Sequence, residues 1–152
     1  MSRKKPKYQK KPFESDGSTS DTSANIYLSM MLSDAWKTLT AKQKVLYLAC
    51  KSRFYAEKRK PNDDALCFTL NQHVWADTLQ LYPKTNARAF YRDLAALIEH
   101  GFIICVQSGA ATRTKSIYRF SDAWQRYGTE AFSVAPTSMT LSMLHKAQGE
   151  KP

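Results

Sequence analysis

The sequence predicts an α+β domain in which three helices pack against a small antiparallel sheet. Three observations indicate this class: a capped helix from Thr40, two closely spaced helices at about 71–80 and 84–100, and two apolar strands around a polar loop. The elements follow the order helix, strand, helix, turn, helix, strand, loop, strand over residues 40–121. A chain of 152 residues has room for one such domain with tails.

The composition divides the chain into three parts. Residues 1–24 are expected to form a disordered basic tail and linker, residues 25–128 the domain, and residues 129–152 a weakly structured tail. The basic residues of the first tail are Arg3, Lys4, Lys5, Lys7, Lys10 and Lys11. At the start of the domain, apolar residues alternate at Ile26, Leu28, Met30 and Leu32, which predicts an extended segment with one buried face. Ser33 or Asp34 is expected to cap a short helical turn that contains Trp36.

The first long helix is predicted from its N-terminal signal. Thr40-Ala41-Lys42-Gln43 has the pattern of a capping box. Leu46, Cys50 and Phe54 then fall on one helical face, and the pattern ends before Pro61. Leu66 to Leu70 is apolar and bounded by loop residues, so it is predicted to form a short strand.

Two adjacent helices follow this strand. Asn71 is a suitable N-cap for the first, and the segment Leu81-Tyr82-Pro83 interrupts it. The second begins near Lys84 or Thr85, places Phe90, Leu94 and Leu97 at core spacing, and ends at Gly101. Residues 102–106 and 116–120 form a predicted hairpin around the polar loop 107–115. This order is typical of a winged helix-turn-helix, with a three-helix core and a β-hairpin wing.

Charge suggests what such a domain binds. The chain carries a net charge of +10, with a pI near 9.6, which favours a polyanionic partner over a neutral one. Lys84, Arg88 and Arg92 recur every four residues and therefore form one stripe opposite the apolar face. The first acidic residue near this stripe is Asp93, towards its far end.

The second helix is therefore expected to enter the DNA major groove. Thr85, Asn86 and Ala89 lie beside the stripe in its first turns. Arg can pair with guanine, Asn with adenine, and the methyl groups of Thr or Ala can meet the thymine methyl. Arg113 and Lys115 in the wing loop are expected to approach phosphates or the minor groove. The alternative for the stripe is a solvated basic face without a partner.

Two stretches resemble a known family. The segment Leu39-Thr40-Ala41-Lys42-Gln43-Lys44-Val45-Leu46-Tyr47 resembles the opening helix of winged-helix domains from plasmid and mobile-element replication initiators. The segment Thr85 to Leu94, running into His100-Gly101-Phe102-Ile103, is similar to their recognition helix and following strand. The resemblance implies a domain that recognises an origin or operator in double-stranded DNA, often as a homodimer. The insert from Glu57 to Ala65 and the basic N-terminus depart from the family pattern and leave replication or transcription open.

Other classes have less support in the sequence. His73, His100 and His145 lack partners at metal-ligand spacing, and no nucleotide or nucleophile motif is present, so we expect no metal, cofactor, small-molecule substrate or catalysis. A winged helix that binds a protein, and an RNA-binding role, are the remaining alternatives. Cys50, Cys67 and Cys105 lie in apolar stretches, which is typical of reduced, buried thiols. Together with the lack of a signal peptide or membrane-spanning run, this predicts a cytoplasmic protein with no membrane partner.

Overall fold

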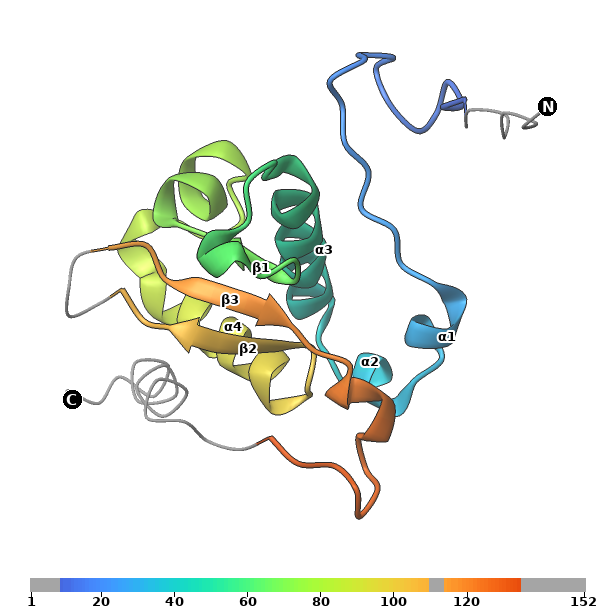
Figure 1. The fold of residues 1–152 in the computed structure, drawn as a ribbon, viewed down its shortest axis with the longest axis vertical. Helices are drawn as coiled ribbons and strands as arrows, with labels where there is room; N and C mark the ends of the chain where they lie inside the picture. The colour runs from blue at the N-terminus through green and yellow to red at the C-terminus, as the bar shows by residue number, and fades with distance from the viewer. Residues whose placement is uncertain (1–8, 110–113, 135–152) are drawn as a thin grey trace.

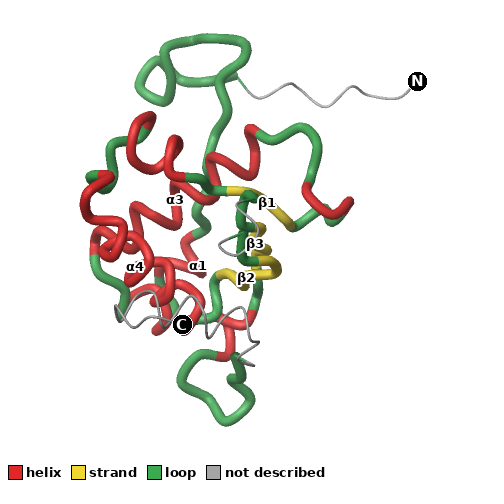
Figure 2. The backbone as a smooth tube through the Cα atoms, turned by 90° about the vertical axis from the view of Figure 1, so that its left-hand side faces the viewer, coloured by secondary structure: helices red, strands yellow, loops and turns green. Residues whose placement is uncertain are grey.

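A computed structural model of the chain describes residues 9–109 and 114–134. These residues form a mixed α+β fold with a three-stranded antiparallel sheet, so the predicted fold class is confirmed at this level. Helices α3 (Ala41–Ala56) and α4 (Ala87–Glu99) lie together on one side of the sheet (Figures 1 and 2). This two-layer arrangement leaves the start of α4 and the adjacent hairpin at the periphery of the core.

Helix α3 begins at the predicted capping box. The Thr40 hydroxyl accepts a hydrogen bond from the Gln43 backbone N–H at 3.3 Å, and Gln43 Oε1 accepts one from the Thr40 N–H at 2.9 Å. Leu46 and Cys50 on its inner face are buried, with Phe54 packed beside them. Burial raises the pKa of the Cys50 thiol to about 12, so this thiol stays protonated at neutral pH. The three cysteines, Cys50, Cys67 and Cys105, are all buried and free, as the sequence predicts.

The sheet has the order β1-β3-β2, so the last strand in the chain is the central one. The strands are β1 (Cys67–Thr69), β2 (Ile103–Gln107) and β3 (Ile117–Phe120). Tyr118 in the centre pairs with Phe68 on one side and Cys105 on the other, and all three are buried. A bulge between Cys105 and Gln107 shifts the register where the hairpin leaves the core.

The helix predicted at 71–80 is shorter than expected, and its turns are wider than those of an α-helix. It forms η2 (His73–Thr78), which has π geometry: the Leu79 N–H donates to the Val74 carbonyl five residues earlier at 2.9 Å. Asn71 caps it as predicted, since its Oδ1 accepts from the Val74 N–H at 3.1 Å. The widened turn directs Trp75 into the core, where it is buried.

Three aromatic rings join η2 to α4. Trp75 stacks on Phe90 with ring centroids 4.4 Å apart, and Tyr82 packs edge-on against Phe90 at 5.7 Å. All three residues are buried. The segment that interrupts the two helices in the sequence is therefore part of the core, because Tyr82 turns inward between them. Such pairs stabilise a fold by about 0.5–1.5 kcal/mol each beyond their buried area.

Asp93 lies inside the protein and not on the surface of α4. Asp93 is 2% exposed. Its carboxylate accepts hydrogen bonds from the Tyr82 hydroxyl at 2.7 Å and from Gln43 Nε2 at 3.3 Å. Arg92 Nε adds a contact at 3.2 Å. Asp93, the first acidic residue that the sequence places near the stripe, is therefore buried and not part of the exposed surface. Helical spacing alone misses this, because the position faces the start of α3, which is 50 residues away in the chain.

Gly101 terminates α4 directly after its C-cap residue His100, as predicted. The Phe102 N–H donates to the Leu97 carbonyl at 3.0 Å and the Gly101 N–H to the Ile98 carbonyl at 3.0 Å, a Schellman arrangement. Gly101 has φ of 81°, and a Cβ there would lie 2.7 Å from the Trp124 backbone nitrogen. Glycine is needed here for both reasons.

The segment at 26–32 differs from its prediction. It forms the short helix α1 (Leu28–Met31) instead of an extended segment. Ile26 and Met30 pack on the core, whereas Leu28 and Leu32 are 67% and 59% exposed. Residues four apart share a helical face, so the alternating apolar residues are divided between two faces and only one of them is covered.

Short elements close one end of the sheet. Ser33 caps α2 (Asp34–Lys37) by accepting from the Trp36 N–H at 3.2 Å. Trp36 packs on Phe102, with ring centroids 6.0 Å apart. Trp124, in η4 (Ala123–Arg126), stacks on the same Phe102 at 6.0 Å. α2 and η4 therefore pack at the end of the sheet away from the hairpin loop (Figure 1).

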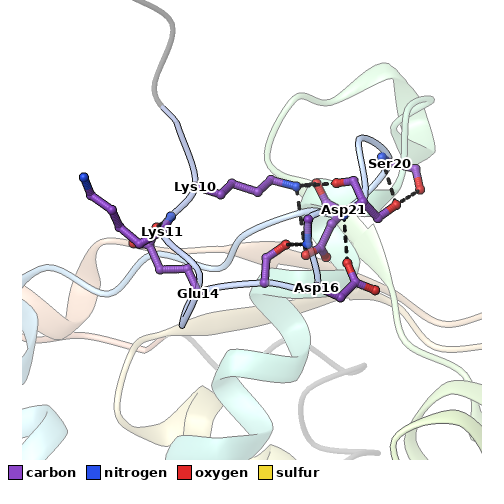
Figure 3. Close-up of polar contacts among 9 residues, drawn as sticks. Lys10, Lys11, Glu14, Asp16, Ser20 and Asp21 are labelled. Carbon is purple, nitrogen blue, oxygen red and sulfur yellow. Dashed lines mark hydrogen bonds and ion pairs between the residues drawn. The ribbon is translucent and has the colours of Figure 1, made fainter.

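The segment 9–27 has no helix or strand and leads away from the sheet (Figure 1). Its polar contacts are local: Lys10 Nζ donates to the Ser18 carbonyl at 2.6 Å and lies 4.0 Å from Asp21 Oδ2 (Figure 3). The other predicted basic residues of the tail, Arg3, Lys4, Lys5 and Lys7, lie outside the described residues, as do residues 135–152.

Replacing Gly101 with alanine should destabilise the fold more than the same change at Gly128. Both glycines have left-handed φ, 81° and 80°, which costs a non-glycine residue about 1–2 kcal/mol. Only at Gly101 does the added Cβ also meet backbone atoms of Ala123 and Trp124. Urea unfolding of the two variants measures the difference, and equal free energies of unfolding would contradict the close packing of η4 on Gly101.

Replacing Tyr82 with phenylalanine should lower the free energy of unfolding by about 1.5–3 kcal/mol, because a buried carboxylate loses a hydrogen bond. Tyr55, which is 47% exposed, offers the matched control, and Tyr55→Phe should change stability by less than about 0.5 kcal/mol. Thermal and urea unfolding measure both. A Tyr82→Phe variant as stable as the Tyr55→Phe control would show that the contact with Asp93 does not support the fold.

Candidate nucleic-acid interface

The candidate interface begins at the turn before α4. Pro83 leads into the 3₁₀ turn η3 (Lys84–Asn86), and Asn86 then caps α4 by accepting a hydrogen bond from the Ala89 N–H at 3.3 Å. Lys84 and Thr85 therefore lie in the turn and not in the helix proper. Both side chains are exposed.

The stripe expected on α4 is present. Lys84, Arg88 and Arg92 are exposed, whereas Phe90, Leu94 and Leu97 on the opposite face are buried. A helix that buries one face this fully presents its other face at a fixed orientation. Arg88 and Arg92 in the first turns of α4, with Lys84 in the turn before it, consequently lie on one side of the helix.

Two residues named in the prediction have structural roles as well. The Oδ1 of Asn86 is the acceptor that a bidentate contact with adenine requires, and the cap already uses it. Ala89 is half-buried and packs against the core, so only part of its methyl group faces outward. The exposed members of the predicted set are Lys84, Thr85, Asn86, Arg88, Arg92 and Lys115.

The folded chain places an acidic side chain beside each end of the stripe, and the sequence pattern alone does not predict these contacts. Asp77, from η2, lies 2.9 Å from Lys84 Nζ and 3.1 Å from His73 Nδ1. The hydrogen bond from Lys84, and then that from His73, lowers the pKa of the Asp77 carboxyl. At the other end, Arg92 Nε lies 3.2 Å from the buried carboxylate of Asp93, so each end of the stripe has one acidic neighbour: exposed Asp77 beside Lys84 and buried Asp93 beside Arg92.

The hairpin lies next to α4. Its base is closed by the Gly109 N–H, which donates to Ser116 Oγ at 3.0 Å, and by the Thr114 N–H, which donates to the Gly109 carbonyl at 3.2 Å. Lys115 is exposed at this base. Arg113, with residues 110–112, lies outside the described residues, so its predicted role has no structural counterpart here.

A hollow of about 300 Å³ separates the hairpin from the two helices. Its lining includes Gln72 before η2, Tyr91 on α4 and Lys115 on the hairpin. The structure thus brings Lys115 to the same region as α4, across the hollow. Sequence reasoning did not identify Gln72 or Tyr91, because only the fold places the start of η2 opposite the hairpin.

The described residues contain no group of three or more His, Cys, Asp or Glu side chains placed to hold a metal ion. Within the same part of the chain, no helix has the length and apolar character needed to cross a lipid bilayer.

Comparison of the chain with protein-family models, curated proteins and solved structures gave no match.

Proposed function

We propose that this chain is a winged helix-turn-helix protein that binds duplex DNA sequence-specifically, with α4 in the major groove and the β2–β3 hairpin as the wing. One observation carries the proposal: α4 buries its apolar face, while Lys84 in the preceding turn and Arg88 and Arg92 on α4 are exposed beside a hairpin that bears Lys115. The strand order supports the fold assignment, because β1 pairs with the last strand of the hairpin and joins the wing to the helices.

The residues have different roles in this proposal. Arg88 and Thr85, in the exposed first turns, read base edges, whereas Lys84, Arg92, Arg113 and Lys115 position the protein on phosphates. Asn86 orients the helix through its cap and reaches DNA through its amino group, while Ala89 offers its methyl group. The protein acts without a cofactor, as a binding module and not an enzyme, in the cytoplasm.

We place this binding in plasmid or mobile-element replication initiation because residues 39–47 and 85–103 resemble those initiator domains. Selection of bound sequences from random duplexes gives the site, and a palindromic product would indicate a homodimer. A plasmid that carries the selected site should then replicate only in cells that express the protein. Specific binding without replication would favour a transcription regulator, and no enriched sequence would favour a protein-interaction module.

Arg88→Ala should weaken binding to the selected duplex roughly tenfold or more and reduce discrimination against a mismatched base at one position. Lys37→Ala, an exposed charge on α2, is the matched control and should leave affinity and discrimination unchanged. Fluorescence anisotropy across a salt series measures both. A flat dependence of wild-type affinity on salt would overturn duplex binding altogether.

Asp77→Asn should strengthen DNA binding about two- to fivefold, the size expected when a surface ion pair of ~0.5–1 kcal/mol is removed and Lys84 becomes available to phosphate. Asp122→Asn, which removes the carboxylate 3.5 Å from Arg126 at the other end of the sheet, is the control. Unchanged or weaker binding by Asp77→Asn would mean that Lys84 does not face DNA. The gain should diminish as salt concentration rises.

A further inference from the structure

A second basic surface borders the hairpin at Lys115. It is an open groove of about 520 Å³ between the loop 57–63 and the base of the hairpin. We call it the basic groove, and its basic lining residues are Arg53, Lys58, Arg59, Lys60 and Lys115. The acidic residues in its lining are Glu57 and Asp63.

The loop is fixed to the sheet at its beginning. Glu57 Oε1 accepts hydrogen bonds from the Thr69 N–H at 3.1 Å and the Thr69 hydroxyl at 2.5 Å, and it lies 2.9 Å from Arg53 Nε. Thr69 pairs with Ile117 across the sheet, two residues after Lys115. The insert is therefore attached directly beside the hairpin. The Glu57 side chain is 9% exposed, and its carboxylate is engaged by Arg53 and Thr69 within the protein.

The loop is fixed at its other end as well. Asp64 accepts from the Leu66 N–H at 2.9 Å and from Arg119 Nε, on β3, at 3.0 Å. The hydrogen bond from Leu66, and then that from Arg119, lowers the pKa of the Asp64 carboxyl. Two anchored ends give the loop a defined path along the groove.

The cations between these anchors face outward. Lys58 and Arg59 are exposed and make no ion pair with any residue in the described part of the chain. Lys60 instead folds back, donating to the Phe54 carbonyl and lying over the Phe54 ring. With Glu57 engaged by Arg53 and Thr69, the groove keeps a surplus of positive charge that Asp63 only partly offsets. Such an arrangement attracts a ligand with closely spaced negative charges.

Lys115 connects this groove to the proposed DNA-binding face. It lines both the basic groove and the hollow between the hairpin and α4. An anionic chain that crosses the base of the hairpin at Lys115 thus meets cations on both sides. Duplex DNA carries one negative charge per ~1.7 Å of helix axis and matches a continuous path of this kind.

We propose that the basic groove binds the phosphate backbone of DNA beyond the segment contacted by α4, so that the insert 57–65 extends the footprint past the wing. This inference rests on the proposed function. The contact is to phosphate and is therefore independent of base sequence. It assigns Lys58 and Arg59 as the contacting residues and Glu57, Asp64 and Arg119 as the residues that position their loop.

The double variant Lys58→Ala/Arg59→Ala tests the inference. Affinity for the selected duplex and for an unrelated duplex of the same length should fall by the same factor, on the order of tenfold at moderate salt. The log–log salt slope should decrease by about 2 for both duplexes. The matched control Lys37→Ala/Arg126→Ala removes the same charge from α2 and η4 and should keep the wild-type slope. Thermal unfolding confirms that both variants are folded.

Two further variants sharpen the test. Asp63→Asn should strengthen binding to both duplexes about twofold, since it removes the carboxylate that opposes phosphate in the groove. Lys58→Arg/Arg59→Lys should restore the wild-type slope, because charge and not side-chain shape makes the contact. A slope equal to that of the control in the Lys58→Ala/Arg59→Ala variant would overturn the inference while leaving the proposed function intact.

Failure of the proposed function gives a different result. Wild-type protein would then bind neither duplex. Isothermal titration with inorganic tripolyphosphate would then show whether the basic groove binds an anion other than DNA. Tripolyphosphate binding that is lost in Lys58→Ala/Arg59→Ala, without DNA binding by wild type, would assign the groove to a free polyphosphate and overturn the DNA assignment. Absence of binding to both ligands would overturn the groove as an anion site.

Discussion

The buried carboxylate of Asp93 is the interaction on which the candidate interface depends. It joins Gln43 at the start of α3, Tyr82 in the turn and α4 itself through hydrogen bonds of 2.7–3.3 Å. Gln43 also closes the capping box of α3, so its amide group fixes the N-terminus of one helix and contacts the other. A buried charge is costly unless its hydrogen bonds are satisfied, and satisfying them here sets the rotation of α4 about its axis. That rotation determines which residues of α4 face outward.

Charge is distributed unevenly over the described surface. Several carboxylates are used inside the fold or in local pairs: Glu57 anchors the insert, Asp64 holds Arg119, and Asp77 holds Lys84. Lys58, Arg59 and Lys115 remain exposed. The overall basicity of the chain is therefore concentrated in particular places by its ion pairs, and a net charge alone does not locate it. The hairpin base lies between the two basic regions, which gives Lys115 its central position.

Sequence signals predicted the structure correctly where the contacts involved join residues that are close in the chain. The capping box at Thr40, the cap at Asn71 and the termination at Gly101 all involve residues within five positions of one another. The apolar spacing of α4 likewise identified its buried face. Prediction was wrong at 26–32, where alternation was interpreted as an extended segment although a single helical turn formed. It also misplaced Asp93, whose partner Gln43 is 50 residues away.

The order and type of the main elements follow from local sequence patterns, because capping, periodicity and turn chemistry act between near neighbours. These patterns also locate the exposed cations of α4, since a 3.6-residue period separates its two faces. Four features arise only when the chain is folded: the π geometry of η2, the inward turn of Tyr82, the pairing of Lys84 with Asp77 and the contact of the insert with the hairpin. Each of these features depends on contacts between segments that are distant in the chain, or on a turn geometry that tertiary packing favours. Local sequence patterns therefore do not predict them.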